Sequence, residues 1–163
     1  ATIRKQANSD YLTNLPNRRY FFEQAKIISN KKKSNNRTVI LAMIDIDHFK
    51  VINDNLGHDV GDEVLKGLAK IFMTLFSDQL VARLGGEEFA IYFDNINFES
   101  VRNRLESFRS HIEEITIHDV SFTISIGLTQ QANYDIDEVL KIADQHLYTA
   151  KESGRNIVIS DED

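Results

Sequence analysis

The fold of this chain is decided by the stretch Leu80-Val81-Ala82-Arg83-Leu84-Gly85-Gly86-Glu87-Glu88-Phe89-Ala90-Ile91-Tyr92-Phe93. Two short apolar runs flank adjacent glycines, and Gly-Gly supplies the positive φ angles that a tight two-residue turn requires, so the stretch predicts a β-hairpin. The carboxylates of Glu87 and Glu88 follow the turn directly. Such a tip can hold a metal ion while its bare backbone lets a phosphate come close, but taken alone it is more often a solvated loop.

The hairpin needs a strand beside it, and the continuous apolar run over residues 39–44 is typical of a strand buried on both faces. That run ends in Asp45-Ile46-Asp47. If the hairpin pairs beside this strand, the two acid clusters meet at one edge of the sheet. Carboxylates plus a backbone carbonyl, without a His or Cys partner, suit a hard cation such as Mg²⁺. We place Asp45 at this cation and Asp47 on the opposite face of the sheet; the alternative is that these acids only cap strand ends.

Four other segments carry apolar residues at helical spacing. The first begins at Asn17, which is expected to be its N-cap, and the second has Asp59 in the same role. The segment between the buried strand and the second helix, residues 53–61, is predicted to be a loop because of its glycines. The expected helices cover residues 18 to about 30, 60–75, 101–112 and 136–150.

Two further strands are predicted near the end of the chain. Residues 122–127 alternate between apolar and small polar types, which is typical of a half-buried strand, and residues 157–159 form a short apolar run. The order of elements indicates an α+β fold in which helices pack on a mainly antiparallel sheet.

Composition limits the class of protein. With 163 residues and 42% hydrophobic content the chain suits one domain with a substantial core, and its lack of cysteine excludes disulfides and thiolate chemistry. The net charge of −6 argues against broad nucleic-acid binding, and no apolar run approaches the roughly 20 residues of a membrane span. We expect residues 1–9 to end an upstream linker or signalling helix and residues 10–160 to form the domain. An upstream sensor region is expected in the longer parent protein.

Three cations could meet phosphates: Lys50, Lys151 and Arg155. Lys50 leaves the carboxyl end of the buried strand, where free backbone N–H groups can bind an anion. Lys151 and Arg155 are four residues apart and share one helix face or its frayed end. The alternative for these two is an ordinary helix terminus, where basic residues offset the dipole.

Two polar side chains could recognise a base. A carboxylate such as Asp62 can accept from the ring N–H and the amino group of guanine, while the amide of Asn53 reads another edge. Asp62 could instead complete a capping arrangement with Asp59, three residues earlier. His58 either contacts the ligand or satisfies the loop backbone.

These residues lie within an ordered series of motifs that runs from about residue 8 to 160. The series consists of Asp10-Tyr11-Leu12-Thr13-Asn14-Leu15-Pro16-Asn17-Arg18-Arg19, Asp45-Ile46-Asp47-His48-Phe49-Lys50-Val51-Ile52-Asn53-Asp54, Gly57-His58-Asp59-Val60-Gly61-Asp62, Arg83-Leu84-Gly85-Gly86-Glu87-Glu88-Phe89, Ser125-Ile126-Gly127 and Ala150-Lys151-Glu152-Ser153-Gly154-Arg155-Asn156. Together they resemble the GGDEF family of diguanylate cyclases. One motif alone has a high false-positive risk, but an ordered series at family spacing is specific.

The resemblance implies a palm-like fold, similar to ferredoxin-like nucleotidyl cyclases and polymerases. It also implies the condensation of two GTP into cyclic di-GMP with release of two pyrophosphates. Asp45, the backbone carbonyl of Ile46 and Glu87 would bind Mg²⁺, with Mn²⁺ as a substitute. Glu87 would also accept the proton of the attacking 3′-hydroxyl, and Glu88 belongs to the same signature with a less defined role.

The resemblance further implies how GTP is held. Asn53, His58 and Asp62 would bind it, with Asn53 and Asp62 on guanine. Lys50 would stabilise charge on the transferring phosphates. The remaining contacts would come from Gly85 and Gly86, against which the phosphates lie, and from Lys151 and Arg155, which clamp the phosphate tail.

Each such domain holds one GTP, so the resemblance implies a homodimer of two antiparallel domains. The domain is expected to be cytoplasmic, whether or not its parent protein is membrane-anchored. The sequence departs from the family pattern at Glu87, where the family name has Asp, and at Phe76-Ser77-Asp78-Gln79, where the inhibitory Arg-x-x-Asp would stand. We therefore expect no product feedback through that site. The alternatives are a catalytically silent GTP-binding regulatory module and a cyclase that uses ATP, against which Asp62 argues.

Overall fold

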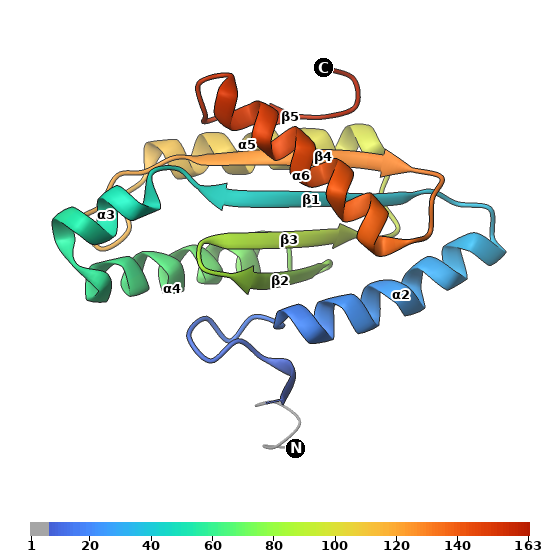
Figure 1. Cartoon of the computed structure of the whole chain (residues 1–163), viewed down its shortest axis with the longest axis horizontal. Helices are drawn as coiled ribbons and strands as arrows, with labels where there is room; N and C mark the ends of the chain where they lie inside the picture. Colours follow the sequence, from blue (N-terminus) through green and yellow to red (C-terminus); the bar gives the residue numbers. More distant parts are fainter. Residues whose placement is uncertain (1–6) are drawn as a thin grey trace.

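The computed structural model describes residues 7–163 and contains a single five-stranded sheet within them. Its strands are β1 (Val39–Ile46), β2 (Leu80–Gly85), β3 (Glu88–Phe93), β4 (Ile124–Gln131) and β5 (Val158–Ile159). They lie in the order β2-β3-β1-β4-β5, and every neighbouring pair is antiparallel except β4 and β5 (Figure 1). The prediction of an α+β fold with a mainly antiparallel sheet is confirmed.

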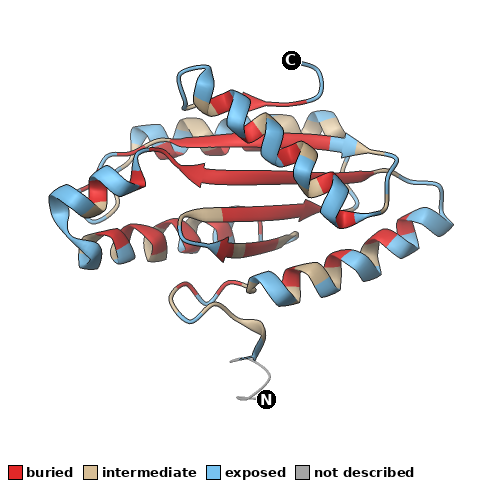
Figure 2. Ribbon diagram, in the orientation of Figure 1, coloured by how far each residue is buried: buried red, intermediate tan, exposed pale blue. Residues whose placement is uncertain are grey.

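Helices cover both faces of this sheet. Side chains of α2 (Arg18–Ser34) and α6 (Ile136–Glu152) pack on one face. Side chains of α3 (Phe49–Leu56), α4 (His58–Leu75) and α5 (Phe98–Glu114) pack on the other. Figure 2 shows the result: the central strands are buried along nearly their whole length, while each helix is buried only in a stripe.

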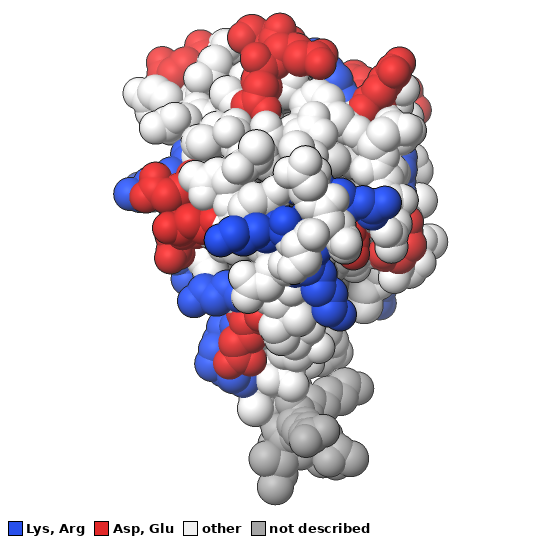
Figure 3. All heavy atoms as spheres, turned by 90° about the vertical axis from the view of Figure 1, so that its right-hand side faces the viewer, with Lys and Arg blue, Asp and Glu red and all other residues white. Residues whose placement is uncertain are grey.

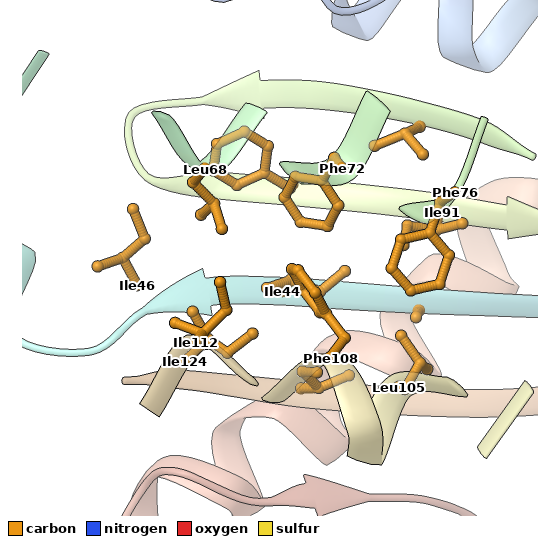
Figure 4. Close-up of a cluster of buried hydrophobic side chains, with 14 of the residues drawn as sticks. Ile44, Ile46, Leu68, Phe72, Phe76, Ile91, Leu105, Phe108, Ile112 and Ile124 are labelled. Atoms are coloured by element: carbon orange, nitrogen blue, oxygen red, sulfur yellow. The ribbon is translucent and has the colours of Figure 1, made fainter. Parts of the chain in front are cut away.

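The larger core lies between the sheet and the helices α4 and α5. Figure 4 shows Ile44 and Ile91 of the sheet pointing toward Phe72 and Phe108 of these helices. The ring centroids of Phe72 and Phe108 are 4.8 Å apart, and Phe76 packs edge-on to Phe108 at 5.3 Å. These buried aromatic pairs fix α4 and α5 on the sheet.

The β1 strand is buried at all eight positions because it lies between two cores. Alternate residues from Ile40 to Ile46 join the core with α4 and α5, and Val39, Leu41 and Met43 join the core with α2 and α6. The prediction that residues 39–44 are buried on both faces is therefore confirmed.

The prediction of a half-buried strand over residues 122–127 was wrong. The β4 strand begins at Ile124, and its first six residues are all buried. Gly127 explains this: a Cβ there would lie 2.1 Å from the carbonyl oxygen of Ala143. The missing side chain lets α6 lie directly on β4, so small residues line the second buried face of the strand.

Three predictions about the helices also need correction. The first helix continues beyond Asn30 to Ser34, with Lys32 buried on its inner side. Residues 53–61 are not a loop, because α3 and α4 follow one another with only Gly57 between them. Gly57, not Asp59, is the N-cap of α4, and Asp59 lies in its first turn. The N-cap role of Asn17 is confirmed, since its side chain accepts from the backbone N–H of Tyr20 at 2.9 Å.

The predicted upstream helix falls mainly on residues 1–6, which are outside the described residues. Within residues 7–163, no helix has the length and apolar character needed to cross a membrane.

Candidate active site

The structure brings the hairpin turn and the end of β1 together at one edge of the sheet (Figure 1). The β3 strand pairs with β1, and Glu88 lies directly opposite Asp45. Residues opposite one another in an antiparallel pair face the same side, so these two carboxylates are neighbours. The backbone N–H of Ile46 also donates to the carbonyl of Glu87 at 3.4 Å. The two acid clusters therefore form one acidic edge.

The turn itself differs by one residue from the predicted Gly-Gly turn. Gly85 still pairs with Glu88, so Gly86 and Glu87 form the two-residue turn. Gly86 has φ 51° and Gly85 has φ 150° beside a bulge after Arg83, and both conformations favour glycine. A Cβ at either glycine would meet no atom within 4 Å, so the turn presents an open backbone surface.

Asp45 is 3% exposed, and within residues 7–163 its one charged partner is Lys151, whose ammonium contacts Oδ2. Its buried Oδ1 has no hydrogen-bond partner in this part of the chain. Burial raises the pKa of Asp45 to about 6; Lys151 opposes this rise, and the negative charges of Glu87 and Glu88 add to it. For Lys151, burial acts to lower the pKa, but Asp45 and the two glutamates hold it above its usual value. A buried carboxylate with a free oxygen beside other acids favours an additional cation.

These residues fit a hard divalent cation by the chemistry of their donors. Two carboxylates, Asp45 and Glu87, can combine with the carbonyl of Ile46 as an all-oxygen set. The remaining coordination positions of Mg²⁺ are usually completed by water and substrate phosphate oxygens. Such a site does not require a third side-chain ligand. Accordingly, residues 7–163 contain no group of three or more His, Cys, Asp or Glu side chains arranged to hold a metal ion.

The prediction that Asp47 faces away from Asp45 was wrong. Residues i and i+2 of an extended strand lie on the same face of the sheet, and this applies to Asp45 and Asp47. Asp47 lies on the α6 side, where it accepts from the backbone N–H of Asn156 at 3.1 Å. It also accepts from the hydroxyls of Thr123 and Ser125. Its oxygens are occupied by protein donors, and so Asp45 remains the better cation ligand of the two.

The predicted nucleotide residues before the hairpin lie on α3 and α4. Lys50 is exposed in the first turn of α3, and Asn53 lies one turn later. His58 begins α4 and Asp62 lies one turn later, both exposed. The position of a Cβ at Gly61 would be 1.9 Å from Oδ1 of Asn53, so glycine lets the two helices touch at this point. Asn53 of α3 therefore packs against the turn of α4 that also carries Asp62.

The buried Oδ1 of Asn53 has no hydrogen-bond partner within the described protein. A buried amide oxygen without a partner costs free energy, and a ligand donor beside it would remove that cost.

Of the two terminal cations, Lys151 reaches the acidic edge from the end of α6. Lys151 lies in the last turn of α6 and contacts Asp45. Arg155 lies beyond the helix, in a turn with φ 65°, so it does not share a helix face with Lys151. Its backbone N–H donates to the carbonyl of Ala150 at 3.0 Å, which folds this turn back on α6.

The other lysine cluster of the chain lies far from this edge. Lys31, Lys32 and Lys33 form the last turn of α2, at the opposite end of the molecule from the hairpin turn (Figure 1). Figure 3 shows that Lys and Arg lie among Asp and Glu on that end. The three lysines complement the carboxyl end of the helix dipole and take no part in the acidic edge.

The ion pair that fixes the hairpin to the segment before α2 was not predicted from the sequence. Arg83 binds both carboxylate oxygens of Asp10, at 3.2 and 3.1 Å, and its Nε donates to the carbonyl of Gly86 at 2.9 Å. Asp10 also accepts from the backbone N–H and the hydroxyl of Thr13. An arginine directly before a glycine turn was a usable signal, but its partner is more than seventy residues away in the chain.

A comparison with protein families agrees with this geometry. Residues 7–157 match the family described as "Diguanylate cyclase, GGDEF domain". The chain belongs to the GGDEF domain family.

Curated GGDEF relatives include the "Probable diguanylate cyclase DgcT" of Escherichia coli (strain K12), 38% identical over 94% of this chain and 35% of that protein. A "Diguanylate cyclase" of Vibrio cholerae serotype O1 is 36% identical over 92% of this chain and 48% of that protein. The chain thus spans about a third to a half of the length of these relatives.

Solved GGDEF structures have the same fold. The coiled coil and GGDEF domain of DgcB from Caulobacter crescentus, in complex with c-di-GMP, superposes with a TM-score of 0.89 at 31% identity, covering 98% of this chain and 88% of that one. The active GGEEF domain of a diguanylate cyclase from Vibrio cholerae gives a TM-score of 0.82 at 34% identity, covering 88% and 96%. The palm-like GGDEF fold implied by the motifs is therefore confirmed.

Proposed function

We propose that this GGDEF domain is a diguanylate cyclase, which condenses two GTP into cyclic di-GMP and releases two pyrophosphates. The observation that supports the proposal is the acidic edge, where Glu88 lies opposite Asp45 and the N–H of Ile46 donates to the carbonyl of Glu87 beside an open glycine turn. The names of the relatives agree with this activity. The sequence also retains every acid, glycine and cation that the proposed mechanism uses.

In this proposal each domain binds one GTP across the edge. Asn53 and Asp62 contact guanine, and His58 lies beside them at the start of α4. The phosphates extend over Gly85 and Gly86 toward three cations. Lys50 stabilises the charge that develops on the transferring phosphate, and the two others, Lys151 and Arg155, hold the phosphate tail.

Asp45, the Ile46 carbonyl and Glu87 would hold a divalent cation such as Mg²⁺ or Mn²⁺. When bound, such a cation acidifies a nearby hydroxyl and neutralises phosphate charge. Glu87 in the turn then has two tasks: it places the cation, and it accepts the proton of the attacking 3′-hydroxyl. Glu88, held opposite Asp45 in the sheet, adds negative potential to the same edge.

One domain supplies only half of the reaction, because each holds a single GTP. Two domains must face one another in antiparallel orientation so that each 3′-hydroxyl reaches the α-phosphate bound by the other domain. Activity should therefore rise with dimerisation. The curated relatives are longer than this chain, and we infer that a region upstream of the domain controls dimerisation and provides any membrane attachment. The domain itself would act in the cytoplasm.

We also infer that product does not inhibit the enzyme through an Arg-x-x-Asp site. In its place, Phe76 is buried in the core and Asp78 is bound by Arg104 at 3.1 and 3.0 Å. Inhibition in the low micromolar range that disappears when residues 76–79 are changed would contradict this inference.

The experiment that tests the function supplies the protein with GTP, ATP or both, with Mg²⁺, and resolves the products. Cyclic di-GMP from GTP alone is the expected result. A product that contains adenine would indicate a cyclase of different specificity. Binding of GTP without any product, at high protein concentration or with a fused dimerisation module, would indicate a silent regulatory module.

A further inference from the structure

The buried carboxylate of Asp47 has no role in the mechanism above, although it lies beside the site. It is the first residue after β1 and follows Ile46 directly. Asp47 is 4% exposed, and its backbone N–H donates to the carbonyl of Thr123 at 2.9 Å. Burying a charge is costly unless hydrogen bonds compensate it, so the partners of this carboxylate indicate its purpose.

Three donors surround the two oxygens of Asp47. Oδ1 accepts from the hydroxyl of Ser125 at 2.6 Å, and Oδ2 accepts from the hydroxyl of Thr123 at 2.7 Å and from the backbone N–H of Asn156 at 3.1 Å. The Asn156 N–H also reaches the hydroxyl oxygen of Ser125 at 3.2 Å. An ionised carboxylate is an acceptor only, and so it satisfies this set of donors in a way that an amide cannot.

Asn156 belongs to the turn that carries Arg155. These two residues have φ 51° and 65°, the left-handed conformation that residues other than glycine keep only when their surroundings hold them. On the other side of the turn, the side-chain oxygen of Asn156 accepts from Arg109 of α5 at 2.7 Å, and its amide donates to Glu113. Asp47 provides the link between this turn and β1.

We propose that Asp47 is a positioning residue for the nucleotide phosphates. It holds the turn of Arg155 and the end of α6, with Lys151, in register with the strand end that carries Asp45 and the Ile46 carbonyl. This inference rests on the proposed function, because it assumes that Lys151 and Arg155 bind phosphates. A purely structural role would instead weaken the binding of every ligand equally, through loss of folded protein.

The test replaces Asp47 with asparagine, which keeps the size of the side chain but points an NH₂ group at one of three donors. Two ligands are titrated with Mg²⁺ and followed by NMR: a non-hydrolysable GTP analogue and guanosine, which lacks phosphates. In Asp47→Asn we expect the affinity for the analogue to fall about tenfold and the affinity for guanosine to stay unchanged. The backbone amide of Asn156 should also exchange faster with solvent.

The chain offers a matched control in Asp161. This carboxylate also ties β4 to the segment after α6, accepting from the hydroxyl of Thr129 and the N–H of Gln130, both at 2.8 Å, but at the end of β4 away from the site. Asp161→Asn should leave both affinities unchanged. If Asp47→Asn does not fold, Thr123→Val removes one donor and keeps the charge, and a smaller loss confined to the analogue is expected.

An equal loss for both ligands, or no loss for either, would overturn the inference. The binding measurements do not depend on turnover. Wild-type protein that binds the analogue but forms no cyclic di-GMP would therefore contradict the proposed function while the role of Asp47 could still be measured.

Discussion

At the scale of single residues, the two aspartates at the end of β1 have opposite surroundings. Asp47 is bonded to three protein donors, whereas Asp45 has, among the residues that the structure describes, one ion pair and one buried oxygen without a partner. Burial is the main cause of the raised pKa of Asp45, to about 6. An added cation would stabilise the Asp45 carboxylate, which is buried with a free oxygen. It would not stabilise the Asp47 carboxylate in the same way, because protein donors already bind both of its oxygens.

Asp45→Asn should therefore stabilise the metal-free protein at neutral pH. Between the ordinary pKa of 3.8 and about 6, the folded protein holds a proton that the unfolded chain has lost. Wild-type stability accordingly falls as the pH rises through this window and levels off above it. The gain in the free energy of unfolding for Asp45→Asn should grow by about 1 kcal/mol between pH 5 and pH 7. Urea denaturation in EDTA measures it, and a gain that shrinks with pH would contradict the account.

At the scale of elements, one arginine joins the hairpin to the loop that precedes α2. The side chains of Arg83 and Asp10 are only 11% and 14% exposed, so their ion pair is poorly screened by water. Arg83 also fixes the carbonyl of Gly86 in the turn. A displacement of Asp10 before α2 would therefore be transmitted through Arg83 to the Gly86 turn.

Arg83→Ala should lower the free energy of unfolding by about 2 kcal/mol, because it leaves the Asp10 carboxylate partly buried without its cation. Arg19→Ala is the matched control. Arg19 pairs with Glu23 on the surface, where the two side chains are 54% and 53% exposed, and its loss should cost less than about 1 kcal/mol. Denaturant titration measures both losses. Equal losses in the two variants would show that the buried Arg83–Asp10 ion pair stabilises the fold no more than a surface pair does.

The contact between α3 and α4 leads to a prediction about Gly61. In Gly61→Ala the new methyl group would collide with Oδ1 of Asn53, so α3 must shift and the pair formed by Asn53 and Asp62 is disturbed. We expect at least about tenfold weaker binding of guanine nucleotides, measured by calorimetry. Gly67→Ala is the control: it also crowds a neighbour, the side chain of Ile117, but away from these residues. Unchanged nucleotide affinity in Gly61→Ala would contradict the assignment of the guanine site.

Some of these helices and strands could be located from the sequence and others could not, and the difference has physical causes. Helical apolar periodicity located α4, and a continuous apolar run located the doubly buried β1, because burial alone determines both patterns. It missed α3, a short helix whose last turns and the two glycines that follow it, Gly57 and Gly61, resemble a loop. It also misjudged β4, because the small residues that let α6 pack closely on the strand resemble solvent-facing ones. The meeting of the two acid clusters at one edge could be predicted from their places in the sequence, but the partners of Arg83 and Asp47 depend on tertiary contacts.

At the scale of the whole molecule, the acidic edge lies at one end of the sheet, beside two turn glycines that face open space. In the proposed pair each domain forms one of the two phosphodiester bonds. The consequence can be tested in a forced heterodimer of one wild-type domain and one Glu87→Gln domain.

Such a mixed pair should form the first bond at the intact half-site and fail at the second. We expect the linear dinucleotide with a 5′-triphosphate to accumulate, with little cyclic product, when the reaction is followed by liquid chromatography. A heterodimer of two wild-type domains with the same dimerisation modules is the control. Cyclic di-GMP formed by the mixed pair at half the control rate would contradict one bond per domain.

The central claim is that the acidic edge beside the glycine turn makes cyclic di-GMP, and the rate of product formation from GTP and Mg²⁺ tests it most directly. The comparison is between wild-type protein and Glu87→Gln, both fused to the same dimerisation module and shown to melt at similar temperatures. The account predicts cyclic di-GMP from the wild type and at least about 100-fold less from Glu87→Gln, because the variant loses both a cation ligand and the proton acceptor. Equal turnover by the two proteins would contradict it.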